Sequence, residues 1–240
     1  MDLGITGKVA LVFGGSKGIG LGCAHEFARE GCRVVIAART QATIDDAVAE
    51  LRAAGGQAMG VSADCTTKDG IASAVKMASE TFGSPDILIF NVDSGPKGAF
   101  LDVDDETFAA ANNNNVMAFR WAVQAVFPHM QGKGWGRILT IGTNSVKASA
   151  ELGPFGITIN TLGTGAIATA QFRDVFTKIA EAHGQTYEEH IAERTSHYPI
   201  PRMGTPQDMA AAAAFLCSDR AGFITGQVLI VDGGNLEVLQ

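Results

Sequence analysis

The chain has 240 residues, 46% of them hydrophobic, and a formal net charge of −7. This composition supports one large buried core, so we expect a single domain over residues 1–240, and the acidic balance argues against a general binder of nucleic acids or anionic membranes. No apolar run approaches membrane-spanning length. The four cysteines have neither the spacing of metal ligands nor that of a disulfide framework. Together these observations predict a cytoplasmic protein with reduced thiols and no metal site.

Strand-like and helix-like segments alternate along the chain. The predicted strands are mostly continuous apolar runs, as expected of parallel strands covered on both faces, at 9–13, 33–37, 57–62, 87–90, 137–141, 157–162 and 228–231. Helical runs are predicted at 18–30, 41–54, 67–82, 104–131 and 206–217. This alternation predicts an α/β fold with a Rossmann-like doubly wound parallel sheet in a three-layer α/β/α arrangement. Residues 170–199 break the rhythm and are predicted to form a helical excursion that acts as a substrate lid.

The first predicted strand runs directly into a glycine-rich turn that opens a helical run. The turn reads VFGGSKGIG and contains Gly14, Gly18 and Gly20. Glycines permit a tight turn and close backbone approach to an anion, and a helix N-terminus presents free N–H groups. The turn therefore predicts a nucleotide phosphate site. The simpler interpretation is a turn that needs glycine only for its own backbone geometry.

The end of the second strand indicates which nucleotide is bound. An acid there binds the ribose 2′-hydroxyl of NAD, whereas a basic residue accommodates the 2′-phosphate of NADP. The strand ends in AART, with Arg39 and no acid, and Lys17 lies in the glycine turn. We therefore predict NADP(H), the alternative being that both cations are only solvated surface charges. Asp64, after the third strand, either accepts a hydrogen bond from the adenine amino group or caps the next helix.

Over nearly its whole length the chain resembles the short-chain dehydrogenase/reductase family, especially its 3-oxoacyl-carrier-protein-reductase-like members. The resemblance rests on the glycine turn and Asp64, on DILIFN at 86–91, Asn115, WGRILTIGT at 135–143 and GITIN at 156–160, and on PRMGTPQDMAAAAAFLCSD and FITGQVLIVDGG near the C-terminus. It implies an NADP(H)-dependent oxidoreductase that interconverts a carbonyl and an alcohol on a small molecule. It also implies a homodimer or homotetramer that pairs partly through the C-terminal strand.

The resemblance implies site residues as well. The implied cofactor contacts are Gly14, Ser16, Lys17, Gly18, Ile19, Gly20, Arg39, Asp64, Cys65, Asn91, Ile167 and Thr169, the last two beside the nicotinamide carboxamide. For catalysis, Thr143 stands at the position of the family's serine and would bind the substrate oxygen. Asn115 would hold a water molecule of the proton relay, and Ser145 is a fallback hydroxyl donor.

One family feature has no counterpart in the sequence. Members carry a Tyr-x-x-x-Lys pair on a long helix between the fifth and sixth strands, and its tyrosine passes a proton to the carbonyl oxygen. Here the only tyrosines are Tyr187 and Tyr198, both outside that region. The connection from Thr143 to Gly156 has room for about seven helical residues, 146–152, or about 10 Å of helix, which would leave apolar side chains of the central strands exposed. A second hypothesis is therefore an NADP(H)-binding protein with impaired catalysis that acts as a sensor or assembly partner.

Two further patterns lie in the excursion. Three histidines recur every seven residues from His183, and we interpret them as exposed helix residues rather than metal ligands. Phe172, Val175, Phe176 and Ile179 form an apolar stripe at helical spacing. Core or lid packing is the default interpretation of this stripe, and the lining of an apolar substrate site is the alternative.

Overall fold

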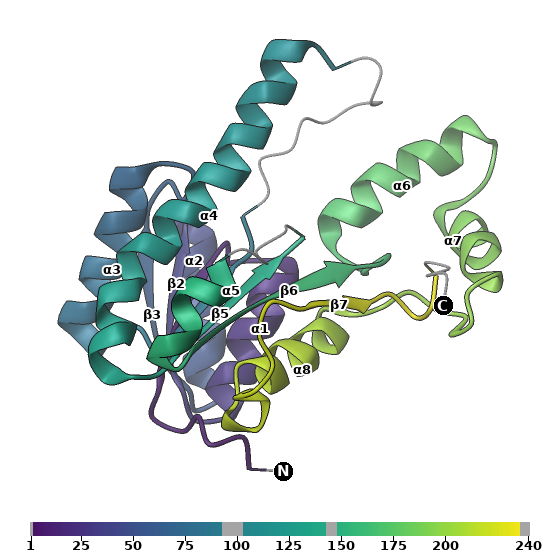
Figure 1. Ribbon diagram of the computed structural model, residues 1–240. Coiled ribbons are helices and arrows are strands. Elements are labelled where there is room, and N and C mark those ends of the chain that lie inside the picture. Colours follow the sequence, from purple (N-terminus) through teal and green to yellow (C-terminus); the bar gives the residue numbers. More distant parts are fainter. Residues whose placement is uncertain (1, 93–102, 143–147, 236–240) are drawn as a thin grey trace.

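The apolar runs predicted as strands form one seven-stranded sheet in the computed structural model, which describes residues 2–92, 103–142 and 148–235 (Figure 1). The strands are β1 Val9–Phe13, β2 Arg33–Ala38, β3 Gln57–Ser62, β4 Ile87–Phe90, β5 Gly136–Ile141, β6 Ile157–Thr164 and β7 Val228–Val231. Neighbouring strands run parallel, in the order β3-β2-β1-β4-β5-β6-β7. The strand order reverses between β1 and β4, and a doubly wound sheet opens a ligand crevice at that point, outside the carboxyl ends of its strands.

Two layers of helices cover the sheet and enclose one apolar core on each face. The core on one face takes side chains from α1 Gly18–Arg29, α2 Gln41–Ala53 and α8 Pro206–Leu216, and the core on the other from α3 Lys68–Phe82, α4 Asp105–Lys133 and α5 Ala148–Leu152. Successive strand residues alternate between the two cores, so Val12 belongs to the first and Phe13 to the second. The predicted three-layer α/β/α fold is confirmed, and the predicted element ends differ from the observed ones by at most two residues.

The connection between β5 and β6 closes the core more completely than we expected. Its described part holds the five-residue helix α5 and the 3₁₀ turn η2 Gly153–Phe155. The expected exposure of the central strands is wrong, because Ile138, Ile157 and Ile159 are at most 1% exposed. Phe155 packs edge-on against Phe127 of α4, with ring centroids 5.4 Å apart. Bulky aromatic side chains on η2 and α4 thus replace the area that a longer helix would bury.

The predicted excursion consists of α6 Ala170–Ala182 and α7 Tyr187–Ser196, and Figure 1 shows both helices projecting beyond the ends of β6 and β7. Backbone bonds tie its two ends together: Ala168 N–H donates to the Gly204 carbonyl at 2.8 Å, and Gly204 N–H donates to the Ala166 carbonyl at 2.9 Å. The excursion is therefore a closed loop anchored on the carboxyl edge of the sheet. None of the helices in the described ranges is both long and apolar enough to span a bilayer.

Candidate functional site

The turn between β1 and α1 can be built only with glycine at its key positions. Gly14 and Gly18 have φ angles of 71° and 56°, in the left-handed region that side chains rarely adopt. A Cβ on Gly20 would lie 2.2 Å from the carbonyl oxygen of Gly14. The simpler interpretation of these glycines is thus partly right, because the turn needs them for its own packing.

The N-terminus of α1 remains open to an anion. Its N-cap residue, Lys17, makes no side-chain cap hydrogen bond, and the first turn holds no acidic residue. The first N–H groups of a helix have no partner within the helix, and the helix dipole adds positive potential there. Lys17 itself is exposed beside them. This end of α1 therefore fits the pyrophosphate of a dinucleotide.

Asn91, the first residue after β4, fixes the crevice where the strand order reverses. Its backbone N–H donates to the Phe13 carbonyl at 3.0 Å, and its side-chain Nδ2 donates to the Gly14 carbonyl at 3.3 Å. The predicted cofactor residue Asn91 thus braces the glycine turn from the neighbouring strand. Its side chain is half-buried, so the bracing is compatible with a further contact to a ligand.

The end of β2 lies next to the glycine turn, because Gly14 N–H donates to the Ala37 carbonyl at 2.8 Å. Arg39 follows two residues later, is exposed, and forms no salt bridge with another described residue. No carboxylate occupies positions 37–40. Sheet topology therefore brings the Arg39 guanidinium beside the glycine turn.

Asp64 and Cys65, which follow β3, border the same crevice. Thr66 donates to the Asp64 carboxylate from its hydroxyl at 2.7 Å and from its backbone N–H at 2.9 Å, and these bonds, with the nearby Arg39, hold the pKa of Asp64 below its usual value. The proposed helix-cap role of Asp64 is wrong, since Thr67 caps α3 by accepting from the Gly70 N–H. Burial raises the pKa of the Cys65 thiol to about 11, so this side chain packs beneath the turn as a neutral group.

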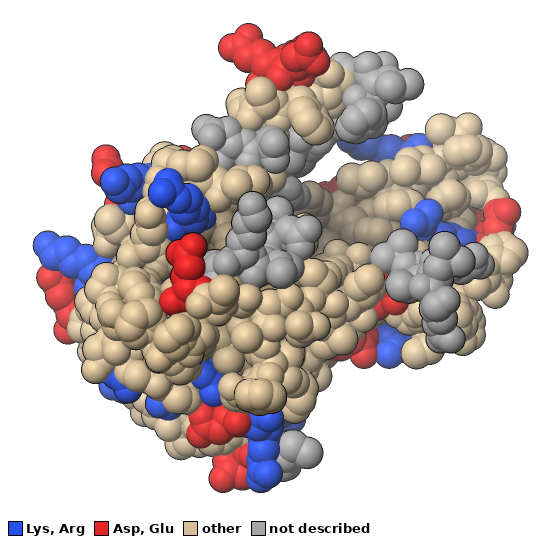
Figure 2. Space-filling view, viewed as in Figure 1, with Lys and Arg blue, Asp and Glu red and all other residues tan. Residues whose placement is uncertain are grey.

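A cavity of about 260 Å³ opens between the carboxyl edge of the sheet and α6. Figure 2 shows the surface hollowed between the projecting part of α4 and the α6–α7 excursion. One wall comes from the first turn of α1, the last residue of β6 and the segment that follows it, and is formed by Ile19, Thr164, Gly165, Ile167 and Thr169. The other wall comes from α6 and is formed by Gln171, Phe172, Val175 and Phe176.

Three predicted cofactor contacts, two of them assigned to the nicotinamide, meet at this cavity. Ile19, Ile167 and Thr169 all line it, and a Cβ on Gly18 would lie 3.4 Å from Cγ2 of Thr169. The Thr169 hydroxyl also caps α6 by accepting from the Phe172 N–H at 3.2 Å. The structure thus brings together residues that lie about 150 positions apart in the sequence.

The structure describes only one of the three predicted catalytic residues. Thr143 and Ser145 lie outside the described residues, and Asn115 is half-buried on α4 with polar or ring contacts of its own. Neither tyrosine lines the cavity: Tyr187 Oη donates to Met203 Sδ at 3.7 Å, and Tyr198 Oη accepts from Arg194 Nε at 3.1 Å.

Sequence reasoning missed Thr164 and Gln171 as lining residues. Thr164 ends β6 at the carboxyl edge of the sheet, where ligands bind in this fold, so its position was a usable signal. Gln171 carries no such signal, because only the folded position of α6 turns it toward the cavity.

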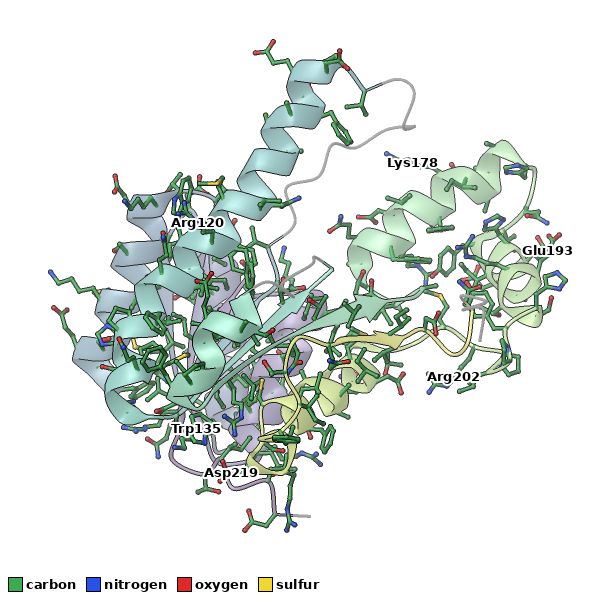
Figure 3. All side chains as sticks on the ribbon, in the orientation of Figure 1. Arg120, Trp135, Lys178, Glu193, Arg202 and Asp219 are labelled. Atoms are coloured by element: carbon green, nitrogen blue, oxygen red, sulfur yellow. The ribbon has the colours of Figure 1, made fainter. Side chains whose placement is uncertain are left out.

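An ion pair holds the end of the excursion to α8. Arg202, shown in Figure 3, donates hydrogen bonds to both carboxylate oxygens of Asp208, at 2.7 and 3.0 Å.

Comparisons with known proteins agree with this geometry. The chain matches the short chain dehydrogenase family over residues 8–149 and the Enoyl-(Acyl carrier protein) reductase family over residues 143–235. The 7alpha-hydroxysteroid dehydrogenase of Escherichia coli (strain K12) is 32% identical over 260 residues, covering 99% of this chain and 98% of that protein. Since this chain has 240 residues, at least 20 aligned positions of that relative have no counterpart here.

Solved structures show the same similarity. The L-sorbose reductase of Gluconobacter frateurii, complexed with NADPH and L-sorbose, matches 100% of both chains with a TM-score of 0.93 and 28% identity. A 7 alpha-hydroxysteroid dehydrogenase complexed with NADH and 7-oxo glycochenodeoxycholic acid matches 100% of this chain and 98% of that chain, with a TM-score of 0.87 and 31% identity. Similar structures thus hold either nicotinamide cofactor.

Proposed function

Since the chain belongs to the short-chain dehydrogenase family, it is an oxidoreductase of the carbonyl/alcohol type, and we propose that it uses NADP(H) on a small-molecule substrate. The preference for NADP(H) depends on one observation. Arg39 is exposed beside the glycine turn, forms no salt bridge within the described ranges, and has no carboxylate near it in positions 37–40. A guanidinium at this position can bind the 2′-phosphate of NADP(H). The 2′-hydroxyl of NAD(H) would lack the acidic residue that usually binds it.

The residues of the crevice fit a dinucleotide in order along its length. The open N-terminus of α1 would hold the pyrophosphate, Lys17 and Arg39 the 2′-phosphate, and Asp64 the adenine amino group. Ile167 and Thr169 would orient the nicotinamide at the cavity. When bound, the cofactor supplies or accepts the hydride, while the protein orients the reacting groups and excludes water.

We infer that proton transfer does not use the Tyr-x-x-x-Lys pair of the family. None of the nine described residues that line the cavity is titratable, and both tyrosines lie elsewhere. We infer that the Thr143 hydroxyl donates a hydrogen bond to the substrate oxygen, with Ser145 as the fallback donor. Asn115 would hold a water molecule that passes the proton. The Escherichia coli enzyme has aligned residues without a counterpart in this chain, and we propose that some of them belong to the connection between β5 and β6.

The second hypothesis is an NADP(H)-binding protein with impaired catalysis. The absence of a tyrosine at the cavity favours it, whereas the similarity to oxidoreductases over the whole chain favours turnover. We therefore retain turnover as the proposed function, with binding alone as the outcome that would replace it.

Assembly into a homodimer or homotetramer is a further part of the proposal. Among the described strands, the edge strand β7 pairs with β6 alone, and its Val228, Leu229 and Ile230 side chains are 37–48% exposed. An apolar edge strand left open favours pairing with another chain. A second copy of this chain is the partner that the family resemblance implies.

The decisive experiment combines cofactor binding with turnover. NADPH binding is measured by its fluorescence, and NADPH oxidation by absorbance with a panel of ketones and 3-oxoacyl thioesters. Turnover that falls roughly 10²–10³-fold in Thr143→Ala, with unchanged NADPH affinity and rescue by Thr143→Ser, would support the assigned role. Binding without oxidation of any substrate would establish the second hypothesis instead.

A further inference from the structure

We propose that the substrate presents an apolar ring next to its carbonyl or carbinol carbon, rather than a polyhydroxylated or charged group. This inference rests on the proposed function, because it assigns the nicotinamide to one wall of the cavity. With Ile167 and Thr169 beside the nicotinamide, the substrate faces the opposite wall, which α6 supplies.

The α6 wall ends in a stack of two aromatic rings. Phe172 and Phe176 lie one helical turn apart, with ring centroids 4.0 Å apart and planes at 12°. Arg194 of α7 lies over Phe176 at 5.1 Å from the ring centroid, and the His190 ring is 5.9 Å away. Phe176 therefore contacts Arg194 and His190 of α7 in addition to Phe172.

The Phe172 end of this aromatic column borders the cavity, and Phe176 lines the cavity as well. Within the described ranges, Phe172 has no ring or cation partner other than Phe176, and it lines the cavity. A flat apolar ring that enters the cavity would extend the column by stacking on Phe172. On the α6 wall Gln171 is the one polar side chain among the described lining residues, so a polyhydroxylated group stacked on Phe172 would lose more water contacts than it gains in partners, which disfavours a sugar.

The described walls of the cavity are uncharged. None of the nine described lining residues is charged. Arg173, next to Phe172 in sequence, pairs with Glu188 at 2.9 Å and lies over the Tyr187 ring of α7. Lys178 follows Val175 by about one turn and is not among the described lining residues; Figure 3 shows its side chain extending from α6 toward the projecting part of α4. The described walls therefore offer no cation to a carboxylate or phosphate close to the reacting carbon.

The test compares three ketones as ligands of the NADP⁺-loaded wild-type protein. The probes are 1-tetralone, which is ring-bearing and flat; 2-decanone, an open-chain ketone of equal carbon number; and L-sorbose. Affinities come from ligand-observed NMR, which needs no turnover. We expect 1-tetralone to bind roughly 3- to 10-fold more tightly than 2-decanone, and L-sorbose not to bind at the same concentration. L-Sorbose or 2-decanone binding as tightly as 1-tetralone would overturn the inference.

Variants separate stacking from general hydrophobicity. Phe172→Leu keeps the wall apolar but removes the ring, so it should abolish the preference for 1-tetralone over 2-decanone. Val175→Lys, at a side chain that is 46% exposed and so tolerant of change, should weaken both ketones. The matched control is Phe82→Leu, a half-buried phenylalanine at the far end of α3, which should change neither affinity. An unchanged preference in Phe172→Leu would refute the stacking role.

Failure of this inference is distinguishable from failure of the proposed function. A wild-type protein that binds NADPH but shows no preference for 1-tetralone contradicts only the substrate class. A wild-type protein that does not bind NADPH contradicts the proposed function and, with it, the assignment of the two cavity walls.

Discussion

Replacing Arg39 with alanine should weaken NADPH binding and leave NADH binding unchanged. A hydrogen bond to a charged group contributes about 1.5–3 kcal/mol, which corresponds to roughly a 10- to 150-fold loss of affinity. Because Arg39 is exposed, salt screens the contact and the loss should lie in the lower part of this range. Arg39→Asp should lose more, since a carboxylate would repel the 2′-phosphate.

The assay is a fluorescence titration of each variant with NADPH and with NADH, at low and at high ionic strength. A matched control is Arg120→Ala, because Arg120 is another exposed arginine without a salt bridge among the described residues, on α4 (Figure 3). The control should change neither affinity. Equal losses of NADPH and NADH in Arg39→Ala would refute the phosphate assignment and leave Arg39 as a surface charge.

Three further predictions concern packing, acid stability and assembly. Gly20→Ala should lower the melting temperature and abolish NADPH binding, because its Cβ would lie 2.2 Å from a backbone oxygen; Gly132→Ala, whose Cβ meets nothing within 4 Å, should stabilise α4 by about 0.5–1 kcal/mol. Hydrogen bonds, chiefly from Arg202, hold the pKa of Asp208 well below its usual value. This carboxylate therefore stabilises the fold above about pH 4, and the stabilisation is lost as the pH falls. Urea denaturation at decreasing pH should therefore show a smaller loss of stability in Asp208→Asn than in the wild type. Light scattering should show a dimer or tetramer that Leu229→Glu dissociates, whereas a monomeric wild type at micromolar concentration would contradict the C-terminal pairing.

The sequence alone determined the secondary structure and its order. The strands predicted from continuous apolar runs and the helices predicted from helical periodicity occur where expected, because these patterns are local and match the period of each element. The glycine turn was equally readable, since left-handed φ angles at Gly14 and Gly18 demand that residue. Asp64 shows the limit of local reasoning: two candidate roles were open, and the hydroxyl of Thr67 three residues later took the capping role.

Tertiary structure decided what these elements do together. Pairing of β1 with β2 places Arg39 beside the glycine turn, and only the folded position of α6 turns Phe172 toward Ile19 to enclose a cavity. The buried face over β5 and β6 was mispredicted because a short connection gives no sign that Phe155 will pack on Phe127, 28 residues earlier in the chain. Local patterns fix φ, ψ and the direction of side chains, whereas contacts between distant segments depend on which surfaces fit when the whole chain closes.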